Sequence, residues 1–136
     1  MNRLASLLLA IFAVTMVSAC QHDPNNEGAT SVSYRTLISR NQANINKLSL
    51  GMSRAEVEHT MGAMEASTKD AIISNPYKVE PMLIGQSQFE VLYYLTRKYP
   101  PFTPIKISQA TPVILKDGKV AGWGWDNLRD AKAGRL

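Results

Sequence analysis

Cys20 has the clearest chemistry in the sequence, because it is the only cysteine in the chain. It lies just behind an apolar run, residues 4–17, that contains no charged side chain. A run of 14 residues has the length of a signal-peptide core, whereas a helix needs about 20 residues to cross a bilayer. Arg3 supplies the positive charge expected before such a core. Residues 1–19 are therefore predicted to be a signal peptide that precedes a reactive thiol.

A thiol at this position is suited to carry a lipid. Val17, Ser18, Ala19 and Cys20 resemble the bacterial lipobox, in which the thiol receives a diacylglyceryl group and cleavage frees the cysteine amine for a further acyl chain. This resemblance implies a covalent diacylglycerol and an N-acyl chain on Cys20 and no other cofactor. Two or more acyl chains hold a protein on a membrane essentially permanently. The alternative is a buried structural cysteine.

The residue after the cysteine indicates which membrane holds the anchor. In enterobacterial-type sorting an aspartate at this position favours the inner membrane, and this chain has Gln21. The sequence thus predicts a lipid-anchored protein of the outer membrane whose domain, the residues after a polar tether at 20–33, faces the periplasm.

Charge and size fit a small envelope domain. The 15 basic and 11 acidic residues give a net charge of +4, which falls to +3 when residues 1–19 and their single charge are removed. A mild positive charge favours anionic lipid head groups or an acidic partner surface. No dense basic stripe alternates with aromatic residues, so the sequence does not indicate nucleic-acid binding.

The other polar residues form no recognisable catalytic or metal-binding set. Glu56 and Glu58 are two positions apart on a predicted helix, so they point in different directions. His22 lies in the tether and His59 on a short helix, and no cluster of His, Asp and Glu has metal-ligand spacing. The chain is predicted not to be an enzyme, and to bind no metal and no small-molecule substrate.

A proline-rich stretch, residues 99–104, is the best candidate for a contact surface. An aromatic set in a rigid proline frame beside basic side chains is typical of surfaces that dock a protein or a lipid interface. The alternative is that the two aromatic residues of this loop pin it to the sheet. The candidate contact residues are Arg97, Lys98, Tyr99, Phe102 and Lys106.

Hydrophobic spacing predicts helices over residues 32–46 and 54–61, the second opened by a capping box of Ser53 and Glu56. Residues 66–74 are predicted to be a first strand or merely extended chain, and further strands are predicted at 77–83 and 88–96, the last of them central. Asp117-Gly118 predicts a two-residue hairpin between residues 111–116 and 119–126, and residues 129–136 are expected to fray.

The hairpin turn also predicts a register. Lys116 should oppose Lys119, Ile114 should oppose Ala121, and Pro112 should oppose Trp123. Trp123 and Trp125 then share a face that either completes the core or offers a contact surface. The glycines of the other face would let a neighbouring element approach closely.

Two segments resemble a known family of bacterial lipoproteins. Residues 50–57, Leu-Gly-Met-Ser-Arg-Ala-Glu-Val, with Gly62, resemble the signature of the SmpA/OmlA (BamE-like) superfamily, and residues 117–124 are similar to its closing hairpin. The resemblance implies an α+β domain over residues 34–128, with two N-terminal helices packed on a small antiparallel sheet as a two-layer sandwich. The chain departs from the family pattern at Ala63-Met64, where the family usually has a proline.

The resemblance also implies a function. The protein is expected to be a small protein-interaction or scaffolding module of the envelope, with a protein partner there and an accessory role in β-barrel assembly. The same helix-and-sheet unit serves in inhibitor proteins, so the alternative is a periplasmic inhibitor of a hydrolase or lysozyme.

Overall fold

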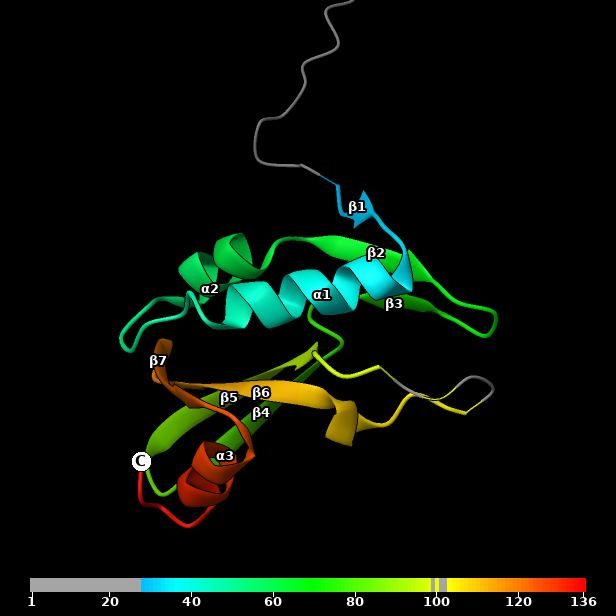
Figure 1. Ribbon diagram of the computed structural model, residues 1–136. Helices are drawn as coiled ribbons and strands as arrows, with labels where there is room; N and C mark the ends of the chain where they lie inside the picture. The colour runs from blue at the N-terminus through cyan, green and yellow to red at the C-terminus, as the bar shows by residue number, and fades with distance from the viewer. Residues whose placement is uncertain (1–27, 99, 101–102) are drawn as a thin grey trace, which may run out of the picture.

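Figure 1 shows the computed structural model of the chain, which describes residues 28–98, 100 and 103–136. A layer of two helices and a small sheet lies on one face of a larger sheet, and a third helix lies on its other face (Figure 1). The elements are β1 (Thr30–Ser31), α1 (Tyr34–Ile45), α2 (Arg54–Met61), β2 (Met64–Ser67), β3 (Ile72–Ser74), β4 (Lys78–Ile84), β5 (Ser87–Leu95), the 3-10 helix η1 (Ile107–Gln109), β6 (Ala110–Lys116), β7 (Lys119–Trp123) and α3 (Trp125–Lys132).

The strands of the described residues form two sheets. Sheet A has the order β1-β2-β3, with β1 parallel to β2, and sheet B is antiparallel with the order β4-β5-β6-β7. The predicted fold class, two N-terminal helices on one small antiparallel sheet in a two-layer BamE-like sandwich, is therefore wrong. The fold is mostly β, with two sheets and a helix after the last strand. β1 also lies within the predicted tether, so the end of that segment belongs to sheet A.

Sheet A exists because the single strand or extended chain predicted at residues 66–74 turns back on itself. The Thr68 amide donates to the Ala71 carbonyl at 2.8 Å, and the Thr68 hydroxyl accepts the Ala71 amide at 3.1 Å. β2 and β3 flank this turn as a hairpin. The two following predicted strands correspond to β4 and β5, and β5 is an inner strand as expected.

Sheet B is buried on both faces over most of its width. One face of β5 and β6 packs against α2, and the opposite face packs against α3. The residues of the α2 face include Leu92, Tyr94, Val113 and Leu115, with Val57 and Met61 from the helix. Those of the α3 face include Val91, Tyr93 and Ile114, with Leu128 and Ala131 from the helix.

The capping box predicted for α2 is present. The Glu56 amide donates to the Ser53 hydroxyl at 3.3 Å, and the Ser53 amide donates to the Glu56 carboxylate at 2.7 Å. The loop before the helix pairs with β7, where the Gly51 amide donates to the Val120 carbonyl at 2.8 Å. This pairing covers the β7 edge of sheet B and leaves β4 as the open edge.

Replacing Ser53 by alanine should lower the free energy of unfolding by about 1 kcal/mol, because the first turn of α2 loses its side-chain acceptor. Urea unfolding of Ser53→Ala beside Ser39→Ala checks this. Ser39 lies exposed within α1, where alanine is the better helix former, so this control should unfold no earlier than the parent chain. Equal loss of stability in both variants would contradict the role given to the cap.

The closing hairpin has the predicted turn but not the predicted register. Lys116 opposes Lys119 as expected, and both residues of the Asp117-Gly118 turn have positive φ, 49° and 79°. A bulge between Ile114 and Leu115 then shifts the pairing by one residue. Gly122 therefore opposes Ile114, and Trp123 opposes Val113.

The end of the chain is ordered, in contrast to the fraying predicted for residues 129–136. Gly124, with φ of 93°, ends β7 and opens α3, which continues to Lys132. Gly122 lets this helix approach closely, because a Cβ atom there would lie 3.0 Å from Cγ of Asn127. Leu136 then packs against the core cluster of the α3 face.

Two asparagines join the layers of the molecule. Asn41 of α1 is fully buried and donates through Nδ2 to Oδ1 of Asn75 and to the Leu95 carbonyl, both at 2.9 Å. Asn75, which connects β3 to β4, donates in return to Oδ1 of Asn41 at 3.0 Å and to the Gly62 carbonyl at 2.9 Å. This network fixes α1 and the end of α2 to the end of β5.

Candidate functional site

The predicted lipidation site lies outside the described residues. This holds for Val17, Ser18, Ala19 and Cys20, and also for Tyr99 and Phe102 of the predicted contact loop. No helix among the described residues has both the length and the apolar character needed to cross a membrane.

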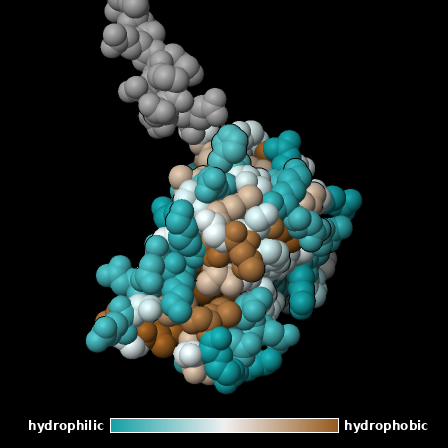
Figure 2. Space-filling model, turned by 90° about the vertical axis from the view of Figure 1, so that its left-hand side faces the viewer, coloured by the Kyte–Doolittle hydropathy of each residue, from teal (hydrophilic) through white to brown (hydrophobic). Residues whose placement is uncertain are grey.

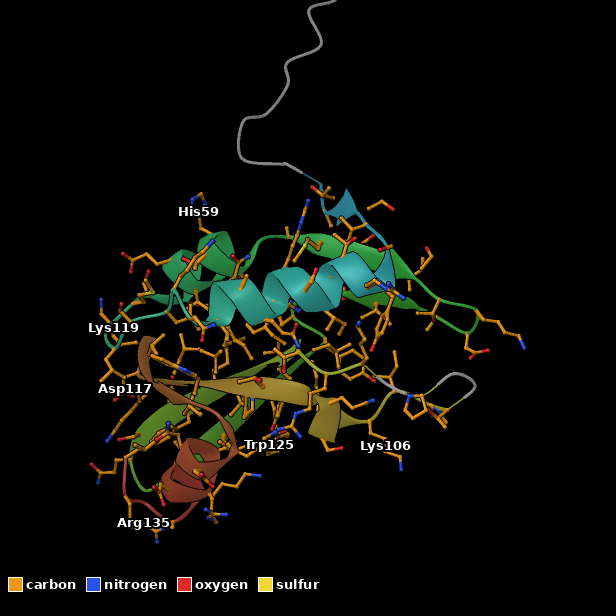
Figure 3. All side chains as sticks on the ribbon, viewed as in Figure 1. His59, Lys106, Asp117, Lys119, Trp125 and Arg135 are labelled. Carbon is orange, nitrogen blue, oxygen red and sulfur yellow. The ribbon has the colours of Figure 1, made fainter. Side chains whose placement is uncertain are left out.

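The described basic residues of the predicted contact loop are exposed. Arg97, Lys98 and Lys106 form no side-chain hydrogen bond or ion pair with the other described residues. Lys106 lies at the end of sheet B opposite the turn that contains Asp117 (Figure 3). Lys106 thus lies on a separate surface from the groove described below.

The two tryptophans have different surroundings. Trp123 is partly buried against the core cluster of the α2 face. Trp125 is the first residue of α3, where its indole Nε1 donates to the Ala110 carbonyl at 2.9 Å. Its ring lies 6.0 Å from that of Tyr93, while 38% of the residue stays exposed. Trp123 therefore packs against the core, whereas Trp125 keeps an exposed part.

A groove that sequence analysis missed lies at the end of sheet B that holds the β4–β5 and β6–β7 turns. It has a volume of about 570 Å³ and opens beside the first turn of α2. Figure 2 views this end of the molecule, where hydrophobic side chains gather between hydrophilic ones. The residues that line the groove are Arg54, Pro81, Met82, Leu83, Gln88, Phe89, Glu90, Leu115 and Gly118.

The groove exists because α2 does not extend over the outermost strand. Val79, Pro81 and Leu83 of β4 lie on the α2 face of sheet B, opposite Leu92, Glu90 and Gln88 of β5. All three are exposed, and Leu83 is 72% exposed. We call these three residues the β4 strip. The available sequence signal was Pro81, which is typical of an edge strand, with apolar residues two positions before and after it.

Charged side chains border the groove on the side of α2. The Arg54 guanidinium bridges two carboxylates, with Nε 2.5 Å from Glu90 and Nη1 3.0 Å from Glu58. These bonds raise the pKa of Arg54, the one to Glu90 most. The nearby Tyr94 hydroxyl is buried, and burial raises the pKa of Tyr94, so the phenol stays neutral at physiological pH. Glu58, Arg54 and Glu90 together carry a net charge of −1.

The described residues contain no group of three or more potential metal ligands. His59 is exposed and points away from the body of the domain (Figure 3). Glu56 accepts the Ser53 amide and Glu58 binds Arg54, so the two carboxylates have different partners.

On the other face of sheet B, Glu80 accepts a hydrogen bond from the Tyr93 hydroxyl at 3.0 Å. This bond, followed by the one from Lys78, lowers the pKa of Glu80. Burial, and then the bond to Glu80, raises the pKa of Tyr93 to about 12. The stability gained from the depressed Glu80 pKa is present above the ordinary glutamate value and is lost as pH falls through the folded pKa. That gained from Tyr93 is present below pH 10 and is lost as pH rises through about 12.

Replacing Tyr93 by phenylalanine should lower the free energy of unfolding by about 1 kcal/mol at pH 7. The loss should be smaller at pH 3 than at pH 7, because a larger fraction of the Glu80 carboxyl is protonated at the lower pH. Urea unfolding at the two pH values checks this. Tyr94→Phe is the matched control and should be neutral at both, because the Tyr94 hydroxyl has no hydrogen-bond partner among the described residues. An equal loss for Tyr93→Phe at pH 7 and pH 3 would contradict the pairing with Glu80.

Comparison with known proteins gives a family but no named relative. No curated protein and no solved structure matches the chain. A family model described as "Protein of unknown function (DUF3192)" matches residues 15–130 of the 136. Because this match covers most of the sequence, the chain belongs to the DUF3192 family.

Proposed function

We propose that the protein is a lipoprotein of the outer membrane whose periplasm-facing domain binds a partner protein in the groove beside β4. Cys20, acylated on its thiol and amine, is the anchor in this proposal. The single observation that carries the binding role is the β4 strip, three apolar residues left uncovered on a sheet face that is otherwise packed. Binding, and not catalysis, is the role that these side chains support.

An anchor at Cys20 would limit how far the domain can lie from the membrane. Seven residues lie between Cys20 and Gly28, the first described residue, and an extended chain covers at most about 3.5 Å per residue. The domain would therefore stay within roughly 30 Å of the lipid surface. At that distance a groove on the domain meets partners that are themselves in or near the membrane. An accessory role in β-barrel assembly, as the SmpA/OmlA resemblance implies, is one specific form of this proposal.

The test compares two aspartate substitutions in the acylated full-length protein, purified from membranes with its bound partners. Leu83→Asp puts a charge into the groove and should reduce partner recovery at least tenfold. Ile72→Asp is the matched control, because Ile72 also lies on an edge strand and is 71% exposed, but in sheet A. The control should retain the partner, and both variants should unfold at the temperature of the parent chain.

The identity of the recovered partner refines the proposal. Recovery of barrel-assembly subunits that is lost with Leu83→Asp supports the accessory role. Recovery of one periplasmic hydrolase, with loss of its activity, would replace the scaffolding role by inhibition. Equal recovery with Leu83→Asp and Ile72→Asp would contradict binding in the groove.

A further inference from the structure

We infer that the segment bound in the groove is a basic amphipathic segment of a partner protein, laid on the face of β4 and not paired with its edge. The inference rests on the proposed function and specifies the chemistry of the partner. It follows from three features of the groove: its edge, its floor and its charge.

The edge of β4 is poorly suited to receive another strand. The β4–β5 hairpin has a two-residue turn closed by Ile84 and Ser87, and such a closing pair exchanges backbone hydrogen bonds. Hydrogen-bonded and non-hydrogen-bonded pairs alternate along the two strands, so the three residues of the β4 strip belong to pairs that are not hydrogen-bonded. Their backbone polar groups therefore point away from β5, toward the open edge of the sheet. Pro81, at the centre of the strip, has no N–H to donate. An added strand would therefore lose a hydrogen bond at the middle of its ladder.

The floor of the groove is suited to large apolar side chains. Pro81 and Leu83 lie exposed on one side, and Leu115 of β6 lines the groove farther under α2. Exposed apolar side chains flanked by polar residues mark interaction sites. A segment with apolar residues on one side would cover this floor without needing backbone pairing.

The border of the groove is acidic on a domain that is otherwise basic. The described residues include 14 basic and 9 acidic side chains, a net charge of +5. Around the groove the balance reverses. Arg54 and Glu90 line the groove, Glu58 bonds to Arg54, and Asp117 accepts the amide of the lining residue Gln88, so this set holds three acidic side chains and one basic one.

The cation that lies over the ring of the lining residue Phe89 faces away from the groove. Lys116 lies on the opposite face of sheet B, where its Nζ is 5.7 Å from the centre of the Phe89 ring and donates to the Leu136 carbonyl. The net charge at the groove is therefore −2.

The carboxylates that bind Arg54 keep room for a second cation. A carboxylate has about four lone-pair positions, and Glu58 and Glu90 each use one for Arg54 in the structure. Both side chains are also partly exposed. A lysine or arginine of the partner would thus bind beside Arg54 without displacing it. Opposite charges across an interface select the partner and its orientation more than they add affinity.

The experiment is a selection of a random peptide library on the acylated full-length protein in detergent. Peptides that bind the parent chain but not Leu83→Asp should be enriched in Lys or Arg next to large apolar residues. Binding of a selected peptide should weaken about tenfold in the double variant Glu58→Gln, Glu90→Gln and should also weaken with salt. The control Glu65→Gln removes an exposed carboxylate of sheet A and should leave binding unchanged.

Two outcomes distinguish a failure of this inference from a failure of the proposed function. Selected peptides that require Leu83 but contain no excess of basic residues, or that are insensitive to the double variant, would overturn the inference and leave the groove as a binding site. If no selected peptide and no cellular partner requires Leu83, the inference and the proposed function both fail.

Discussion

Replacing Asn41 by alanine should lower the free energy of unfolding by about 3 kcal/mol. The change removes both Nδ2 hydrogen bonds of Asn41, to Asn75 and to the Leu95 carbonyl. Leu95 is fully buried, so its carbonyl would lose its partner away from water. The Asn75 side chain would also lose its bond to α1, and a cavity would remain at a fully buried position.

Chemical unfolding of Asn41→Ala beside Asn46→Ala measures this effect. Asn46 is an exposed asparagine at the end of α1 whose Nδ2 donates only within the helix, to the Gln42 carbonyl at 3.2 Å. Its replacement should cost less than about 1 kcal/mol. Similar losses for the two variants would mean that the network between α1, α2 and β5 does not hold the layers together.

Replacing Cys20 by serine should abolish lipid attachment and release the protein from the membrane. A hydroxyl cannot form the thioether to diacylglycerol, and without it the N-terminal segment is not processed as a lipoprotein. Metabolic labelling with an alkyne fatty acid should mark the parent chain and give no signal for Cys20→Ser. Fractionation should find the parent chain with the outer membrane and the variant in an unprocessed or released form.

The control for this experiment is Ser18→Ala, a small residue replaced by a small residue within the predicted lipobox, which should keep label and location. Label that persists in Cys20→Ser, or unchanged retention in the outer membrane, would contradict an anchor at this thiol. If the parent chain is labelled normally but is found in the inner membrane, only the sorting inferred from Gln21 is contradicted.

Local features of the fold could be predicted from the sequence because their causes are local. The capping box of α2 depends on Ser53 and Glu56, three residues apart, and the turn of the last hairpin depends on Asp117 and Gly118. The burial of β5 follows from a continuous apolar run, residues 91–95. Such features need no knowledge of distant residues.

Features that depend on distant residues were not predictable in this way. The division into two sheets requires the turn at Thr68 and the parallel pairing of β1 with β2. The bulge at Ile114 shifts Trp123 by one position, and the positive φ of Gly124 ends β7 where the sequence predicts a longer strand. Helix α3 follows from that break, which is why the end of the chain is ordered.

The groove belongs to this second group. Its residues come from α2, β4, β5, β6 and the turn after β6, and it exists only because α2 stops short of β4. The predicted contact loop, in contrast, was a single continuous segment. The sequence pattern therefore indicates a local cluster of basic and aromatic residues and not a surface that the fold assembles.

Site-specific photocrosslinking at residue 83 in living cells reports directly whether a partner protein lies in the groove beside β4. A photoreactive phenylalanine analogue replaces Leu83 in the full-length protein, and the same analogue at Ile72 serves as the control. We expect one discrete crosslinked partner at position 83 and none at position 72. The captured peptide, mapped by mass spectrometry, should contain apolar and basic residues. A crosslink pattern that is the same at both positions would contradict binding in the groove beside β4.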